Sequence, residues 1–213
     1  MRGISFGALG TVLAIGAHSD DIEIGAGATL LRLVRENPGV RVVWAVLSAS
    51  DARAAEARAS AERFLEGAGR AEVLIRGFRD GHFPADWTEL KAFLESLKPV
   101  HPDLVLTHRT ADLHQDHRIA AELVWNTFRD HAILEYEIPK WDGDLGTPNL
   151  FVPASATDAE RKIALLLDGF ASQRDKHWFD PATFRGLMRL RGLECNAPEG
   201  LAEAFYARKL RLG

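Results

Sequence analysis

The feature of this 213-residue sequence that most restricts its fold is a regular alternation of short apolar runs with longer amphipathic segments. Five β-rich runs are expected to form strands, at residues 11–17, 40–48, 72–76, 103–107 and 132–137. Segments with helical spacing lie at about 22–36, 51–67, 86–98 and 115–130. The first and fourth runs are almost continuously apolar, which is typical of parallel strands buried on both faces. The sequence therefore predicts an α/β fold, a Rossmann-like doubly wound and mostly parallel sheet with helices on both faces.

After residue 138 the pattern changes, beginning with a turn-rich stretch rich in proline and glycine. Three helices are expected in this part, at about 162–170, 181–191 and 200–209. Because no flexible linker or charged block separates it from the rest, we expect a single domain over residues 1–213. The core of this domain is predicted at about 10–138, and a C-terminal elaboration at about 139–213.

Composition and charge exclude several classes of protein. The net charge of −4 shows no basic excess, so we expect no nucleic-acid partner. The single cysteine, Cys195, excludes an intramolecular disulfide framework and fits a reducing compartment. The first 21 residues lack a clear cleavage site and are interpreted as leading into a strand rather than as a signal peptide. No apolar run approaches the roughly 20 residues of a membrane span, so we expect a cytoplasmic protein, with homo-oligomerisation left open.

Polar side chains gather directly after the first and fourth predicted strands, in the sequences HSDDIE and DLHQDH. Ligands bind at the carboxyl ends of strands in open α/β sheets. If strands one and four are neighbours, His18 and Asp21 face His117 across a crevice. Two imidazoles and one carboxylate with an open fourth position form a catalytic type of zinc site. Asp20 then stays free to act as a general base on a water molecule.

Each of these residues also has a simpler structural interpretation. His18 fits a hydrogen-bonded histidine at a strand end, and Asp20 and Asp21 fit the N-cap and first turn of a helix. His114 and His117, three residues apart, fit the exposed start of another helix. From the residues alone, the metal site and these structural roles both stay open.

The two polar clusters resemble the signatures of the LmbE-like, or PIG-L, family of zinc-dependent deacetylases. GAHSDDIEIGAG is similar to that family's AHPDDE motif, and DLHQDH to its HPDH motif. Three more stretches match its helix with Arg-x-x-Glu, the strand before the second motif and a late SQ element: RAAEARASAERFLEG, HPDLVLTH and FASQ. The sequence departs from the pattern at Ser19 and Gln115, which replace prolines, and at Ile22, which is inserted before Glu23. None of these departures falls on a presumed metal ligand, and Glu23 is interpreted as a first-turn residue or a support for the ligands.

The resemblance implies that His18, Asp21 and His117 hold one zinc ion, with iron or manganese as alternatives. It implies that Asp20 is the general base. The family's reaction is removal of an N-acetyl group from an amino-sugar derivative, a small-molecule substrate. An amidase acting on a non-sugar amide and a catalytically silent binding module remain as alternatives.

Four other residues receive roles by the same resemblance. His114 would polarise the substrate carbonyl or protonate the leaving amine, and Asp116 would orient a histidine. Arg53 and Asp80 match positions that contact sugar hydroxyls in the family. Their structural alternatives are a solvated charge on a helix face for Arg53 and a turn former for Asp80.

Further polar residues near the predicted strand ends receive weaker expectations. His108 ends the fourth strand and is expected to line the pocket, while His82 is a candidate substrate contact beside Asp80. His101 belongs to an HPD sequence that imitates the metal motif but precedes a strand, at the wrong edge of the sheet. In the 139–149 loop, Trp141, Asp142 and Asp144 either select substrate or belong to an ordinary surface loop.

Overall fold

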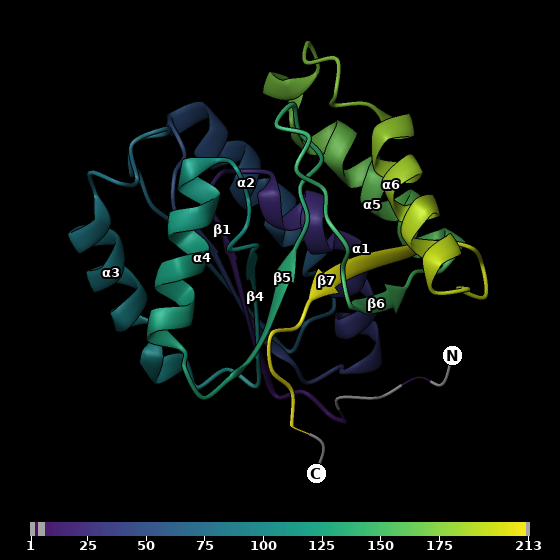
Figure 1. Ribbon diagram of the computed structural model, residues 1–213, viewed down its shortest axis with the longest axis horizontal. Helices are drawn as coiled ribbons and strands as arrows, with labels where there is room; N and C mark the ends of the chain where they lie inside the picture. Colours follow the sequence, from purple (N-terminus) through teal and green to yellow (C-terminus); the bar gives the residue numbers. More distant parts are fainter. Residues whose placement is uncertain (1–2, 4–6, 212–213) are drawn as a thin grey trace.

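The predicted alternation of strands and helices is present in the computed structural model, which describes residue 3 and residues 7–211 (Figure 1). Its strands are β1 (Thr11–Gly16), β2 (Arg41–Val46), β3 (Arg70–Ile75), β4 (Leu104–His108), β5 (Ala132–Tyr136), β6 (Leu150–Pro153) and β7 (Ala202–Tyr206). Its α-helices are α1 (Asp21–Glu36), α2 (Asp51–Phe64), α3 (Trp87–Ser96), α4 (Gln115–Thr127), α5 (Ala156–Gly169) and α6 (Pro181–Glu194). Short 3₁₀ helices occupy Lys98–Val100 and Ala171–Gln173.

The strands form one seven-stranded sheet in the order β3-β2-β1-β4-β5-β7-β6. The first five are mutually parallel, and β7 runs antiparallel to both of its neighbours. Helices α3 and α4 cover one face, and α1, α2, α5 and α6 cover the other (Figure 1). This confirms the predicted single-domain α/β fold with a mostly parallel sheet and helices on both faces.

The sequence of strand β1 is continuously apolar because both faces of the strand are buried. Val12 and Ala14 point into the core beneath α1, whereas Leu13 and Ile15 point into the core beneath α3 and α4. All four are fully buried, so neither face of the strand tolerates a polar side chain. The first polar residues therefore appear only where the strand ends, beyond Gly16.

Close packing between α1 and β5 explains why residue 25 of α1 is a glycine. A Cβ at Gly25 would overlap the buried ring of Tyr136, whose hydroxyl donates to the carbonyl of Ile15 at 2.6 Å. Gly25 therefore allows α1 to lie directly on the sheet. This close approach seats the first turn of α1 above the carboxyl end of β1.

The expected helix at 200–209 is wrong, because this segment contains strand β7. Alanine, leucine and glutamate give the segment a helical propensity, but its position between β5 and β6 overrides that local preference. As a strand, it pairs with the backbone of β5 at Glu135–Tyr206 and Tyr136–Phe205. Strand β6 lies in the stretch predicted only to be turn-rich. The helices expected near 162–170 and 181–191 are present, although α5 begins earlier, at Ala156.

Residues 1–2 and 4–6, at the start of the chain, lie outside the described residues, as do 212–213. Within the described ranges, no helix combines the length and apolar character required to cross a membrane.

Candidate metal centre and active site

The two polar clusters meet at one edge of the sheet. Strands β1 and β4 are adjacent and parallel, as the interpretation of the sequence required. Helix α1 begins at Asp21, directly after β1, and α4 begins at Gln115, after the short turn that follows β4. His114 is the N-cap of α4, and its Nδ1 accepts from the backbone N–H of Asp116 at 3.3 Å. Each strand thus delivers its cluster through a short turn into a helix N-terminus.

Three ligand atoms converge between the clusters. His18 Nδ1 lies 3.1 Å from His117 Nε2 and 3.3 Å from Asp21 Oδ2. His117 Nε2 lies 3.6 Å from Asp21 Oδ2. Ligand atoms bound to a tetrahedral zinc at 2.0–2.1 Å lie about 3.4 Å from one another. The three atoms therefore have the separation that a zinc ion requires.

The outward-facing nitrogens of both imidazoles contact carboxylates. His18 Nε2 lies 3.1 Å from Asp80 Oδ1 and 3.3 Å from Asp116 Oδ2, and His117 Nδ1 lies 3.1 Å from Asp112 Oδ2. If each ring donates its proton outward, two lone pairs face each other at 3.1 Å, an arrangement that a cation relieves. Burial disfavours charge on His18, but hydrogen bonds to Asp116 and Asp21 raise the pKa of His18 well above its usual value, so in the absence of a metal these surroundings stabilise a positive charge at this point. The donor set therefore fits a metal cation.

Other groupings of side chains at this edge also bring ligand atoms within 4.8 Å of one another. They are His18, His114 and His117; Asp21, His108 and His117; and His18, Asp80 and Asp116. His108 is an unsuitable ligand, because its Nε2 already accepts from the backbone N–H of Ala17 at 2.8 Å. His18 Nε2 faces two carboxylates, whereas its Nδ1 faces the other imidazole. The trio formed by His18, Asp21 and His117 is therefore the better candidate.

His108, which was expected to line the pocket, is packed against His117 of this trio. Its ring is fully buried and stacks on His117 with ring centroids 4.0 Å apart. Burial and the charge of His117 lower the pKa of His108 to about 4. His108 is thus a neutral ring at pH 7, and its stacking fixes the plane of His117.

Asp20 is buried, and its two carboxylate oxygens have different surroundings. Arg53, in the first turn of α2, donates from Nη2 to Asp20 Oδ1 at 2.8 Å. Asp20 Oδ2 has no hydrogen-bond partner among the residues that the structure describes. Burial raises the pKa of Asp20, and the nearby charge of Arg53 opposes that effect. A positioned carboxylate with one unoccupied oxygen and a raised pKa suits a proton acceptor.

His114 contributes a second titratable ring. It is partly buried, stacks on His117 with centroids 4.6 Å apart and meets His18 edge-on at 5.1 Å. Burial and the charges of His117 and His18 lower the pKa of His114. Since its Nδ1 accepts a backbone hydrogen bond, the neutral ring carries its proton on Nε2.

Asp80 and Asp116 connect the loop after β3 to His18. The carboxylate of Asp116 accepts from the backbone of Gly81 at 2.6 Å and of Phe83 at 3.1 Å. The Asp80 side chain is 70% exposed, and its hydrogen bond with His18 lowers the pKa of Asp80 to about 2. Asp80 is therefore an ionised acceptor that faces solvent beside the candidate metal ligands.

Two acidic residues of the sequence motifs have structural roles instead. Glu23 is fully buried and accepts from Ser60 Oγ at 2.7 Å, so it joins α1 to α2. Burial raises the pKa of Glu23 well above its usual value. Asp103, from the HPD sequence, accepts from the backbone of Gly10 and Thr11 at 2.8 Å, at the opposite end of β1. This agrees with the expectation that the HPD sequence lies at the wrong edge of the sheet.

Interpretation of the sequence missed two residues of the site, Asp112 and Lys140. Lys140 Nζ lies 3.0 Å from Asp112 Oδ1 and 2.6 Å from Asp144 Oδ1. Asp112 could have been identified from the sequence, because it is the first residue of DLHQDH. No local sequence pattern indicates that Lys140 belongs to the site. Asp144 holds Lys140 and the loop, while Trp141 is 69% exposed and donates to His177 Nε2 at 3.1 Å.

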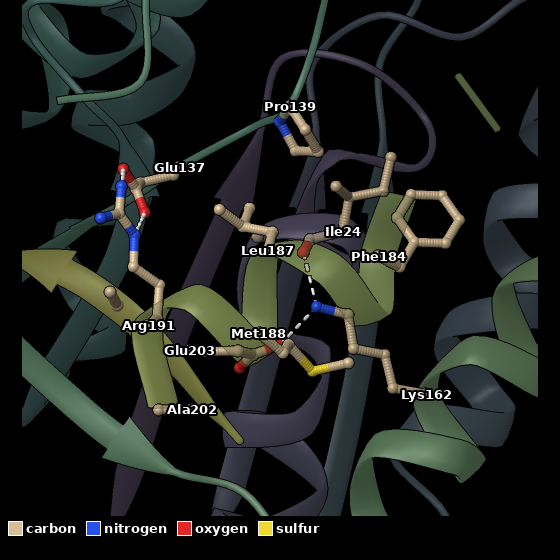
Figure 2. Close-up of a pocket in the computed structure, with 12 residues that line it drawn as sticks. Ile24, Glu137, Pro139, Lys162, Phe184, Leu187, Met188, Arg191, Ala202 and Glu203 are labelled. Atoms are coloured by element: carbon tan, nitrogen blue, oxygen red, sulfur yellow. Dashed lines mark hydrogen bonds and ion pairs between the residues drawn. The ribbon is translucent and has the colours of Figure 1, made fainter. Parts of the chain in front are cut away.

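A separate small hollow lies among α1, α5, α6 and β7, and none of the candidate ligands lines it (Figure 2). Buried Lys162 donates from Nζ to the carbonyl of Ile24 and to Glu203 Oε1, both at 2.6 Å. Glu203 also accepts from the backbone N–H groups of Ala28 and Thr29. This ion pair therefore braces the middle of α1, behind the first turn, which carries Asp21.

Comparison with known proteins places the chain in a family. Structures with similar folds include the conserved protein TT1542 from Thermus thermophilus, with a TM-score of 0.75 and 21% identity over 96% of this chain and 97% of that one. N,N'-diacetylchitobiose deacetylase from Pyrococcus horikoshii has a TM-score of 0.73 and 19% identity, covering 94% and 84%. GalB, a 4-carboxy-2-hydroxymuconate hydratase from Pseudomonas putida, has a TM-score of 0.77 and 19% identity, covering 96% and 98%. The family model described as PIG-L, GlcNAc-PI de-N-acetylase, matches residues 13–128, which include both polar clusters, and the chain belongs to this family.

Proposed function

We propose that the protein is a zinc-dependent hydrolase that removes the N-acetyl group from a small amino-sugar derivative. The observation that carries this proposal is the convergence of His18, Asp21 and His117 beside a carboxylate oxygen of Asp20 that has no partner among the described residues. Structural relatives at low identity include deacetylases that act on N,N'-diacetylchitobiose and in teicoplanin biosynthesis. Family membership and the donor geometry support the same reaction class.

Amide hydrolysis needs a nucleophile that works near neutral pH and a way to stabilise the developing oxyanion. His18, Asp21 and His117 would hold a zinc ion, which would supply Lewis acidity and lower the pKa of water. Asp20 accepts the proton of the attacking water at Oδ2, while Arg53 keeps Oδ1 in place. Asp20 then passes this proton to the departing amine as the C–N bond breaks, and the new carboxyl group loses the second proton of the water, so amide and water give acetate and the protonated amine. General acid–base catalysis of this type contributes roughly 10²- to 10⁴-fold.

Of the two roles expected for His114, donation to the carbonyl oxygen is favoured. Its lowered pKa and its backbone hydrogen bond at Nδ1 leave a neutral ring with a proton on Nε2. Such a ring stabilises negative charge that develops on the substrate oxygen. Asp116 serves the site indirectly, through its contact with His18.

Arg53 and Asp80 are proposed to bind sugar hydroxyls. A sugar carries several hydroxyls and no charge, so its recognition needs donors and acceptors at fixed positions. The guanidinium of Arg53 donates to neighbouring oxygens, and the ionised carboxylate of Asp80 accepts from hydroxyl groups. A site built on such bonds rejects analogues that leave its polar groups unpaired.

An acetate-release assay with zinc-loaded protein tests the proposal. N-acetylglucosamine and its conjugates should be hydrolysed with at least about 10-fold higher kcat/KM than simple N-acetyl amines. On fully zinc-loaded protein, Arg53→Ala and Asp80→Ala should each lower kcat/KM for the sugar, and Arg58→Ala, a change at an exposed residue of the same helix as Arg53, should have no effect. Equal rates on simple amines would favour the amidase, and absence of acetate from every compound would refute the deacetylase.

The native metal is tested by elemental analysis of the purified protein. Zinc at one ion per chain is the expected result, since two imidazoles and a carboxylate are its common catalytic ligands. Such ligands also bind iron and manganese. Iron or manganese in place of zinc would correct the metal and leave the proposed reaction intact.

A further inference from the structure

Asp112 and Lys140 form a chain of buried contacts that ends on the candidate ligand His117. His117 Nδ1 lies 3.1 Å from Asp112 Oδ2, and the other carboxylate oxygen lies 3.0 Å from Lys140 Nζ. The side chains of Asp112 and Lys140 are only 4% and 11% exposed. Asp112 Oδ1 also accepts from the backbone N–H of His114 at 2.8 Å.

This chain controls two properties of the His117 ring. A hydrogen bond from Nδ1 to Asp112 directs the Nε2 lone pair toward His18 and Asp21, and it fixes the ring orientation. The Lys140 ammonium balances the Asp112 carboxylate, which would otherwise be a buried charge without a cation. The contact with the backbone of His114 joins the same carboxylate to the N-cap of α4.

Lys140 reaches this position from a part of the chain outside the family match. The match ends at residue 128, whereas Lys140 lies in the loop that follows β5. Asp144 holds the loop in place, because it binds Lys140 through both oxygens and accepts from the backbone N–H of Leu113 at 2.8 Å. By contrast, the two carboxylates that contact Nε2 of His18 belong to Asp80 and Asp116, which both lie within the matched residues.

We propose that Asp112 and Lys140 are positioning residues for His117, so that metal retention depends on a lysine of the loop after β5. The inference rests on the proposed function only in that His117 binds the metal. The competing explanation is that Lys140 merely anchors the loop. These explanations differ in what they predict for Asp144, which anchors the loop without contacting Asp112 through a hydrogen bond or an ion pair in the described contacts.

The test measures the zinc dissociation constant of full-length protein by competition with a chromophoric chelator. Asp112→Asn and Lys140→Met should each weaken zinc binding by about 10- to 100-fold, the usual effect of removing such a support. Lys91→Met is the matched control, because Lys91 is a partly buried lysine paired with Glu95 and Thr127, away from the site. Its zinc affinity should equal that of the wild type. Thermal unfolding of the metal-free variants identifies any that fail to fold, and Lys140→Gln replaces Lys140→Met in that case.

Asp144→Asn separates positioning from anchoring. If Lys140 acts through Asp112, this variant should keep zinc affinity within a few-fold of wild type. Equal weakening in Asp144→Asn and Lys140→Met would show that loop anchoring is the whole effect and would overturn the inference. Unchanged zinc affinity in Asp112→Asn would also overturn it, while the proposed deacetylase would stand. The proposed metal site itself would be refuted only if His117→Ala bound zinc as tightly as the wild type.

Discussion

The two parts of the sheet contribute different things to the candidate site. The parallel part, β3-β2-β1-β4 with its helices, supplies the three candidate ligands and Asp20, all at the carboxyl ends of β1 and β4. The part that begins with β5 and includes antiparallel β7 and β6 supplies supports. Lys140 balances Asp112, and the Lys162–Glu203 pair braces α1. The candidate ligands and Asp20 lie in two short motifs, whereas Lys140, Lys162 and Glu203, which support these motifs, come from distant segments.

The largest expected effect is loss of metal from His117→Ala. Removal of one of three ligands, in a site where the other two are held rigidly, should abolish stoichiometric zinc binding while circular dichroism shows an intact fold. His131→Ala, before β5 at the far end of the sheet, is the control and should retain one zinc per chain. Full zinc occupancy in His117→Ala would show that His117 is not a ligand and would contradict the assignment of ligands to the parallel part.

Asp20→Asn should separate catalysis from metal binding within that part. Because Asp20 is proposed as the base and not as a ligand, the variant should keep its zinc and lose at least about 10²-fold in kcat. Elemental analysis and acetate release, measured on the same preparation, give both quantities. Asp51→Asn, an exposed residue at the start of α2, should match the wild type in each. Loss of zinc from Asp20→Asn would instead make Asp20 a ligand.

Lys162→Met tests the contribution of the other part. It leaves Glu203 buried without its cation, so the free energy of unfolding should fall by about 3 kcal/mol. The folded variant should still bind one zinc. Arg161→Met, on the exposed side of the same helix, should cost less than about 1 kcal/mol in urea unfolding. If folded Lys162→Met fails to bind zinc, the part of the sheet that begins with β5 also determines metal binding, and the proposed division of roles is wrong.

Glu23→Gln should give the smallest effect, and one that depends on pH. The raised pKa of Glu23 means that the folded state binds a proton more tightly than the unfolded state, whose carboxyl titrates near 4.5. Stability from this group is complete below pH 4.5 and falls as the pH rises toward the folded-state pKa, by at most about 1.4 kcal/mol per pH unit. The glutamine variant should lack this decline, whereas Glu62→Gln, an exposed change in α2, should retain it. Parallel pH profiles for wild type and Glu23→Gln would show that Glu23 is ionised when folded.

Local patterns were sufficient to predict the parallel part of the fold. Continuous apolar runs identified β1 and β4, and the rule that ligands bind at carboxyl ends brought His18, Asp21 and His117 to one edge. Strand β7 could not be predicted in this way, because its sequence favours a helix and its pairing partner, β5, lies far earlier in the chain. Lys140 was missed for a similar reason, since its contact with Asp112 depends on the path of the loop after β5.

The central claim, that a single metal ion at His18, Asp21 and His117 is required for deacetylation, is tested most directly by titration of metal-free protein with zinc. Acetate release from an N-acetylglucosamine conjugate and bound zinc are measured together at each addition. The account predicts no acetate without metal, followed by a linear rise that reaches its maximum at one zinc per chain. Full acetate release from chelator-treated protein that contains no metal would contradict it.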